Sequence, residues 1–211
     1  MPRPATPRRR HAGLATTELV LVVGALGVIA AAGVIVAPLS VGAAPADAPR
    51  AVALDDPQRE AVRLGILELV RESHALLLTR DAPATELALW TSDDRSPGLV
   101  DPDEILVLRF SPTVGAVAAY LREPPTEEDA DQAPGVPPAL VTGALLDVWR
   151  DRPRTTRSVI AAGLEEFRVV TTAAPGNRRA VRVHLVWAPR RADEDAVEGV
   201  FGVRLPPADA A

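Results

Sequence analysis

The residues most suggestive of chemistry lie near the amino terminus, where a single carboxylate meets an apolar segment. Gly13 is followed by Leu14-Ala15-Thr16-Thr17-Glu18, and an uncharged apolar run then extends from Leu19 to Ala37. An unpaired charge at the centre of a membrane costs roughly 2.5–3.5 kcal/mol, and less near the surface. Glu18 therefore needs either a shallow position or a partner of opposite charge, so charge pairing is the chemistry to consider first.

The element that must position Glu18 has the length and the flanks of a membrane-spanning helix. Residues 19–37 would rise about 28 Å as an α-helix, close to one bilayer core. Four arginines precede the run, and the first charges after it are Asp47 and Arg50. Positive charge before a span favours a cytoplasmic amino terminus with the rest of the chain across the membrane. Pro38 provides a natural end to the helix.

Three interpretations of this segment are open. The first is a secretory signal peptide with Val41-Gly42-Ala43 as its small-residue cleavage site. Against it, the apolar core of a signal peptide spans only about 7–15 residues, and Glu18 would stand at its entrance. The second is an ordinary membrane anchor, in which Glu18 has no evident purpose. The third takes Gly13 as a cleavage point, and this one is favoured.

The third pattern resembles the class III leader of type IV pilins and type II secretion pseudopilins: a short basic leader, glycine, an apolar residue, and glutamate at the fifth mature position. Gly13 matches the residue before the cut, Leu14 the first mature residue, and Glu18 the fifth-position glutamate. The resemblance implies cleavage after Gly13 by a prepilin peptidase and N-methylation of Leu14. The new amine is largely protonated near neutral pH. Glu18 of one subunit would neutralise the amine of a neighbour in a packed filament, which favours assembly in register.

Three features depart from this pattern. The largest is that a typical pilin helix continues unbroken from the membrane into the head, whereas here Pro38, Pro45 and Pro49 interrupt the chain between them. Phenylalanine is the commoner first mature residue in pilins, where this chain has Leu14. The span is also rich in glycine and alanine, which admits a resemblance to the TadE-like pseudopilins of tight-adherence systems. Small residues one turn apart, such as Gly27 and Ala31, would permit close helix approach.

The carboxyl-terminal half loosely resembles minor pseudopilins of the type II secretion J class, through Trp90, the acidic loop that follows it and the alternating strand at 181–187. The resemblance implies a pilin-like structural subunit of a type II secretion or type IV pilus-like filament, and not an enzyme. It implies three partners: a prepilin peptidase, other pilin-like subunits and the inner membrane. The chain would cross that membrane once, with a periplasmic head. The alternative is a membrane-anchored or Sec-exported extracytoplasmic binding domain.

The sequence predicts four regions and an α+β head. They are a basic leader (1–13), a transmembrane and assembly helix (14–39), a Pro/Ala-rich linker (40–55) and the head (56–211), which contains an acidic loop at 123–138. Asp55 or Asp56 can cap a helix that starts at Pro57 and runs to about Thr79. Strand patterns follow at 87–90, 105–110, 114–121, 166–172, 179–187 and 197–205. The expected head is one helix packed on an antiparallel sheet.

One loop has the spacing of a calcium site. Asp93, Gly98, Asp101 and Glu104 fall at positions 1, 6, 9 and 12 of a twelve-residue calcium loop. Arg95 and Pro97, however, occupy positions 3 and 5, where ligand oxygens belong. The favoured interpretation is a turn without metal, so no cofactor is expected. Calcium bound by Asp93, Asp101 and Glu104 is the alternative.

Composition narrows the remaining functions. The chain has 211 residues and a net charge of −5, which argues against the basic face that nucleic-acid binding requires. It has no cysteine, so it has no thiolate metal site and no cysteine nucleophile. The sequence shows no phosphate-binding glycine loop, nucleophile elbow or zinc signature. An enzymatic function therefore has no candidate residues.

Overall fold

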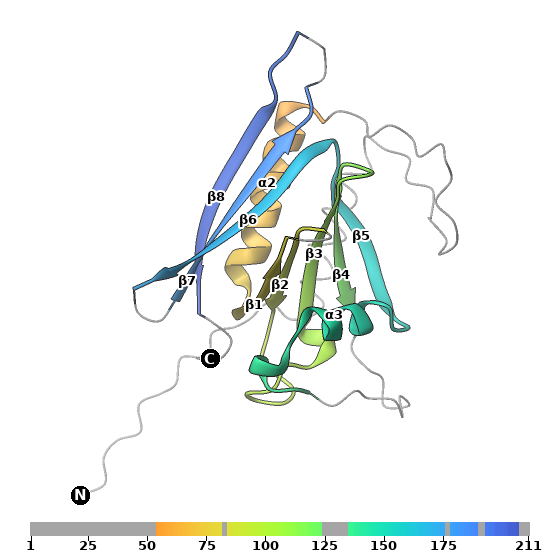
Figure 1. Ribbon diagram of the computed structural model, residues 1–211, viewed down its shortest axis with the longest axis vertical. Coiled ribbons are helices and arrows are strands. Elements are labelled where there is room, and N and C mark those ends of the chain that lie inside the picture. Colours follow the sequence, from red (N-terminus) through yellow and green to blue (C-terminus); the bar gives the residue numbers. More distant parts are fainter. Residues whose placement is uncertain (1–53, 82–83, 124–134, 176–177, 190–192, 207–211) are drawn as a thin grey trace, which may run out of the picture.

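The computed structural model describes residues 54–81, 84–123, 135–175, 178–189 and 193–206. Within them, eight strands form two antiparallel sheets (Figure 1). The five-stranded sheet has the order β1 (Ala75–Arg80), β2 (Glu86–Trp90), β3 (Ile105–Ser111), β4 (Ala116–Arg122), β5 (Thr155–Ala161). The three-stranded sheet consists of β6 (Leu164–Ala174), β7 (Arg178–Trp187) and β8 (Val197–Leu205). The helical elements are α2 (Asp56–Glu72), α3 (Gly143–Arg150) and two short 3₁₀ turns, η1 (Pro102–Glu104) and η2 (Pro138–Leu140).

Helix α2 begins where the sequence places a cap. The Asp55 side chain accepts a hydrogen bond from the backbone N–H of Gln58 (2.9 Å), and the Gln58 side chain accepts one from the backbone N–H of Asp55 (2.8 Å). This reciprocal pair satisfies two backbone donors that a helix start leaves unpaired. Asp55 itself is extended, with φ −77° and ψ 168°. The predicted cap is confirmed, and α2 starts as a helix of its own.

Two hydrophobic cores lie on opposite faces of the five-stranded sheet. One face packs against the apolar side of α2 and the inner face of the three-stranded sheet, in a single cluster that includes Ile66, Leu108 and Phe167. The other face packs against α3 through Trp90, Val107 and Trp149. Because both faces are covered, β3 is apolar at nearly every position.

The three-stranded sheet, by contrast, is covered on one side. Along β7, Val181, Val183, Leu185 and Trp187 are buried, as the alternation in the sequence predicts. The intervening His184 points to the other face, where its Nδ1 lies 3.2 Å from Glu198 of β8. The predicted hairpin of β6 with β7 is confirmed, and β8 is an edge strand as expected.

The predicted head, one helix packed on one antiparallel sheet, is wrong. Eight strands in two sheets dominate the described structure, and only α2 and α3 are α-helices. The expected long helix ends at Glu72, and the apolar run Leu76-Leu77-Leu78 belongs to strand β1 instead. A short apolar run fits either a buried helix or a buried strand, so periodicity alone could not separate them. The chain changes sheets at Gly163, whose φ of 71° suits glycine.

The membrane-spanning helix expected at 14–39 lies outside the described residues. No helix within the described ranges is long and apolar enough to cross a bilayer.

Candidate functional site

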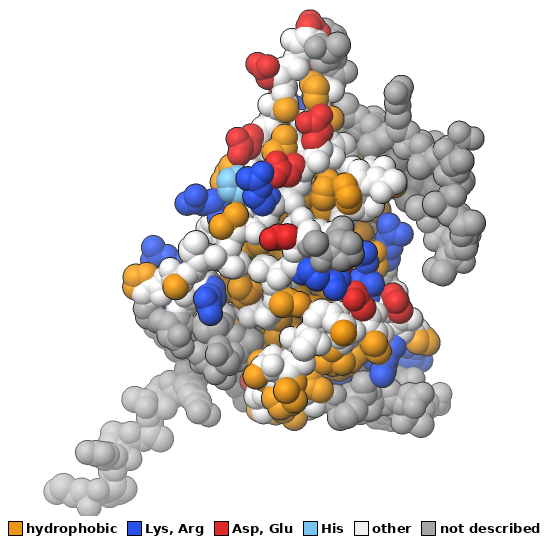
Figure 2. Space-filling view, viewed as in Figure 1, with side chains coloured by type: hydrophobic (Ala, Val, Ile, Leu, Met, Phe, Trp, Pro, Cys, Tyr) orange, Lys and Arg blue, Asp and Glu red, His pale blue; other side chains and the backbone are white. Residues whose placement is uncertain are grey.

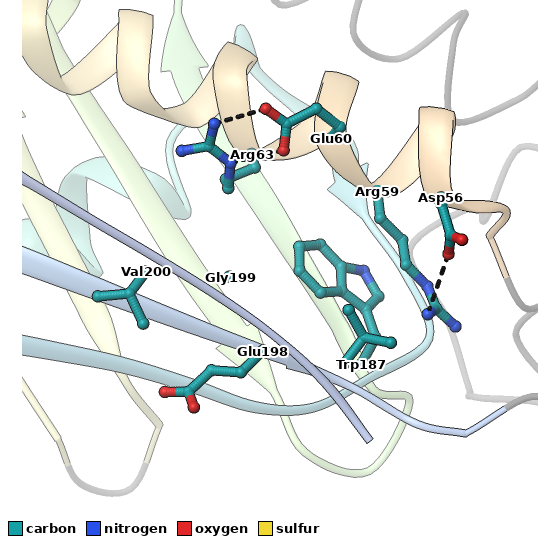
Figure 3. A pocket seen from close by; sticks show the side chains of 9 residues that line it. Asp56, Arg59, Glu60, Arg63, Trp187, Glu198, Gly199 and Val200 are labelled. Carbon is teal, nitrogen blue, oxygen red and sulfur yellow. Dashed lines mark hydrogen bonds and ion pairs between the residues drawn. The ribbon is translucent and has the colours of Figure 1, made fainter. Parts of the chain in front are cut away.

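A pocket lies between the first turns of α2 and the adjoining ends of β7 and β8 (Figure 3). Its volume is about 480 Å³. Charged residues of α2 line one side, and Trp187 with the start of β8 lines the other. We call it the α2 pocket; its lining residues are Asp56, Arg59, Glu60, Arg63, Trp187, Val197, Glu198, Gly199 and Val200.

The charges of α2 in this pocket are paired along the helix. Nη1 of Arg59 lies 3.6 Å from Oδ1 of Asp56, and Nε of Arg63 donates to Oε2 of Glu60 at 2.7 Å. The hydrogen bond from Arg63 lowers the pKa of Glu60, so this carboxylate stays charged at neutral pH. The pocket wall on the helix side therefore carries two ion pairs, each between residues three apart on α2.

The strand side of the pocket depends on a glycine. An added Cβ at Gly199 would lie 2.9 Å from Cζ3 of Trp187 and 3.3 Å from Cδ of Arg63. Gly199 therefore allows the indole and the arginine stem to approach β8 closely. A glycine within a strand pattern is the sequence signal for such an approach.

Two N–H groups at this pocket have no acceptor among the described residues. They are Nε of Arg59 and Nε1 of Trp187, on residues that are 5% and 2% exposed. In Figure 3 the indole nitrogen is on the side of the ring that faces Arg59. A buried donor without an acceptor costs about 1–3 kcal/mol. Both groups would therefore gain from an acceptor such as a carbonyl or carboxylate oxygen.

The predicted processing and assembly residues, Gly13, Leu14 and Glu18, lie outside the described residues. The same holds for most of the predicted acidic loop. The structure does describe the junction with the head: Asp55 caps α2 beside the α2 pocket.

The structure describes all three predicted calcium ligands, and it engages two of them within the loop. Oε1 of Glu104 accepts hydrogen bonds from the backbone N–H groups of Asp94 (3.0 Å) and Arg95 (3.1 Å), and Oε2 accepts one from Nε1 of Trp90 (3.2 Å). Asp93 accepts from the backbone N–H of Gly98 at 2.8 Å. Asp101 is buried, with Oδ2 unpartnered in the described structure. No group of three or more potential ligands is gathered around one point in the described ranges.

The Glu104 carboxylate thus holds the loop together through its hydrogen bonds. Burial raises the pKa of Glu104, while the N–H donors of Arg95, Trp90, Asp94 and Asp101 act in the opposite direction. The neighbouring Asp103 is buried too, and it pairs with Nη1 of Arg95 at 2.7 Å. The acidic residues of the predicted calcium site thus lie in one loop. In it, the Glu104 carboxylate accepts hydrogen bonds from backbone and indole N–H groups.

A second polar cluster, which sequence analysis did not predict, is centred on the buried Glu86. Three arginines from different elements reach its carboxylate: Arg80 at 2.5 Å, Arg150 at 3.2 Å and Arg109 at 3.3 Å. Asp147 of α3 joins them by two hydrogen bonds to Arg80, at 3.0 and 3.1 Å. The cluster fixes α3 to the sheet. No local sequence pattern marks it, because its members come from β1, β2, β3 and α3.

Comparisons of the chain with protein-family models, with curated proteins and with solved structures found no match.

Proposed function

We propose that this protein is a pilin-like structural subunit, inserted in the inner membrane and assembled into a filament of a type II secretion or type IV pilus-like apparatus. One observation carries the proposal: a basic leader, Gly13-Leu14, a glutamate at position 18 and an uncharged apolar run stand in this order and spacing. The proposal takes nothing from the fold of the head.

The physical argument concerns two charges that are costly alone. Cleavage after Gly13 leaves a protonated amine on Leu14, and Glu18 carries a carboxylate at the entrance of the apolar helix. Each charge is penalised in a membrane interior. Pairing the amine of one subunit with the glutamate of the next removes most of both penalties and favours one register between neighbours.

The partners follow from this arrangement. A prepilin peptidase would cut the leader on the cytoplasmic side, because the arginines hold that side. Other pilin-like subunits would pack along the apolar helix. The head would lie in the periplasm and contribute subunit contacts, with the α2 pocket next to the linker that joins head to membrane.

A second candidate is a membrane-anchored or exported binding domain. The α2 pocket favours it, because a hollow of about 480 Å³ lined by Arg59, Arg63 and Trp187 has room for a ligand group. The two candidates differ in the first residue of the mature chain, and in whether Glu18 matters for assembly.

The test is a pair of substitutions at Glu18 in cells that contain an active prepilin peptidase. Glu18→Ala should be cut after Gly13 as efficiently as the natural chain, yet be missing from sheared filament fractions. Glu18→Asp, which keeps the charge, should recover part of the assembly. Filaments that accept Glu18→Ala at the natural level would contradict the proposal.

A further inference from the structure

Beyond the edge of α3, the outer face of the five-stranded sheet is hollowed and basic. The hollow has a volume of about 290 Å³. Its floor consists of small side chains such as Ala116 and Ala118, and its polar rim contains Arg109, Arg157 and Tyr120. None of the described residues that line it is acidic. We call it the basic hollow; the remaining lining residues are Ala84, Phe110, Ser111, Pro112 and Thr113.

Among the described residues that line this hollow, two are arginines and none is acidic, while Asp81 and Glu166 line the pocket that adjoins it. Arg109 has a carboxylate partner in Glu86, as Arg80 and Arg150 do. Arg157 of β5 is exposed and has no carboxylate partner among the described residues; its guanidinium lies 6.0 Å from the centre of the Tyr120 ring. Figure 2 shows basic side chains over the region next to α3, with acidic side chains beside them. Arg157 is the arginine of the hollow's lining that is left for a partner from outside.

The opposite charge lies at the far end of the three-stranded sheet. Asp193, Glu194 and Asp195 are exposed just before β8, and Glu198 follows within the strand. Arg190 and Arg191 precede them in the sequence, so the acidic residues remain in excess by two. Figures 1 and 2 show this end of β8 projecting from the body, with acidic side chains along it. We call residues 193–198 the acidic tip.

The acidic tip and the basic hollow lie well apart in the same view, so one molecule cannot join its own tip to its own hollow. We infer that the acidic tip of one subunit docks in the basic hollow of a second copy of this chain. Charge complementarity and shape both argue for this occupant, since a projection of one sign meets a concave surface of the other. The floor of alanines leaves room for the carboxylate side chains to reach Arg157 and Arg109.

This contact uses two different surfaces of the subunit. Such a head-to-tail interface does not close on a pair, and it continues from copy to copy into a ring or an open helical filament. The inference rests on the proposed function for its setting, and it adds to that function a specific contact between the periplasmic heads of neighbouring subunits. Exposed ion pairs change an association constant by only up to about fivefold each, so the contact orders the heads while the apolar helices hold the filament.

The test uses cysteine pairs, because the natural chain has no cysteine. Two full-length variants are produced together in cells that contain the prepilin peptidase. One carries Thr113→Cys at the hollow, and the other carries Ala196→Cys at the tip. Ala173→Cys, an exposed alanine at the opposite end of the same sheet, replaces Ala196→Cys in the control pair. After oxidation, the tip pair should give at least about fivefold more cross-linked dimer than the control pair.

Charge reversal makes the same test specific. Arg157→Glu in the Thr113→Cys copy should lower the yield of the tip pair, and Asp195→Arg in the other copy should restore it. Equal yields for the tip and control pairs would overturn the inference, as would a yield indifferent to Arg157→Glu. The amino-terminal mass of the same samples separates the two claims. If the chains are cut after Gly13 but the cross-link does not form, only the docking is contradicted. If the cross-link forms but the chains are uncut, only the pilin-like processing is contradicted.

Discussion

At the scale of single residues, the contact between Gly199 and Trp187 sets the shape of the α2 pocket. The indole is buried and packs against β8 at a point where an added methyl group would be only 2.9 Å away. Gly202, three residues further along the strand, has space: its Cβ would lie 3.7 Å from the carbonyl oxygen of Val181. The two glycines therefore form a natural pair of test positions.

Gly199→Ala should lower the free energy of unfolding by about 1–3 kcal/mol, because the added methyl group must displace the Trp187 ring or the Arg63 stem. Gly202→Ala should change it by less than about 0.5 kcal/mol. Urea unfolding of the purified chain, followed by tryptophan fluorescence, measures both, since Trp90, Trp149 and Trp187 are all buried. Equal effects at the two positions would refute the packing argument.

Glu104 offers a second prediction at this scale. Glu104→Ala removes the acceptor of Trp90 and of three backbone N–H groups, those of Asp94, Arg95 and Asp101. Donors left unpaired away from water cost about 1–3 kcal/mol each. We expect a loss of at least about 3 kcal/mol in the free energy of unfolding. Asp93→Ala removes one exposed hydrogen bond and should cost about 1 kcal/mol or less. A smaller loss for Glu104→Ala than for Asp93→Ala in the same unfolding assay would be decisive against this role.

The roles of single residues were predictable from the sequence where they depend on neighbours only a few positions away. The cap at Asp55 depends on a pattern of four consecutive residues and is confirmed. The acidic residues of the 93–104 loop were correctly expected in one turn, but their spacing could not tell a metal ligand from an acceptor of N–H groups. Trp90, which donates to Glu104, lies outside the twelve-residue pattern.

At the scale of elements, α3 is held on the sheet by charge as well as by its apolar side. Asp147 bonds both Nη atoms of Arg80, and Nη1 of Arg150 lies 2.9 Å from Oδ1 of the same carboxylate. The hydrogen bond from Arg80 holds the pKa of Asp147 below its usual 3.8. Because the folded pKa is depressed, Asp147 contributes stability above about pH 3.8, and that contribution is lost as the pH falls through the folded pKa.

Asp147→Asn should therefore lower the free energy of unfolding by about 1 kcal/mol or less near neutral pH, since the carboxylate is 39% exposed. The difference from the natural chain should shrink as the pH falls below about 3.8. Asp151→Asn is the matched control on an exposed carboxylate, and its effect should stay near zero throughout. If the difference in unfolding free energy between Asp147→Asn and the natural chain grew as the pH fell, the proposed role of the Asp147 carboxylate would be contradicted.

Element types were predictable where a pattern persisted over many residues. The alternation in β7 identified a strand with one buried face, and the turn at 175–177 identified its hairpin with β6. The pattern failed at residues 75–80, where three leucines in a row fit a helix and a strand equally, and at β5, which the sequence did not mark as a strand. The cluster around Glu86 was also unpredictable, because it forms only when β1, β2, β3 and α3 meet.

At the scale of the whole molecule, the arrangement of strands into two sheets was not evident from the sequence. Strand patterns report which side of a strand is buried, and they do not report which strands share a sheet. The change of sheet at Gly163 depends on one backbone conformation. The start of helix α2 at its Asp55 cap was correctly predicted, yet the helix packs against strands of both sheets and not on a single one.

The central claim is that a glutamate at the entrance of an apolar helix meets an amine created by cleavage. The most direct test is the mass of the amino-terminal peptide of the protein purified from cells with an active prepilin peptidase. We expect a chain that begins with N-methylated Leu14. A chain that begins at Met1 or Pro2, or at Ala44 after a signal peptidase cut, would contradict it.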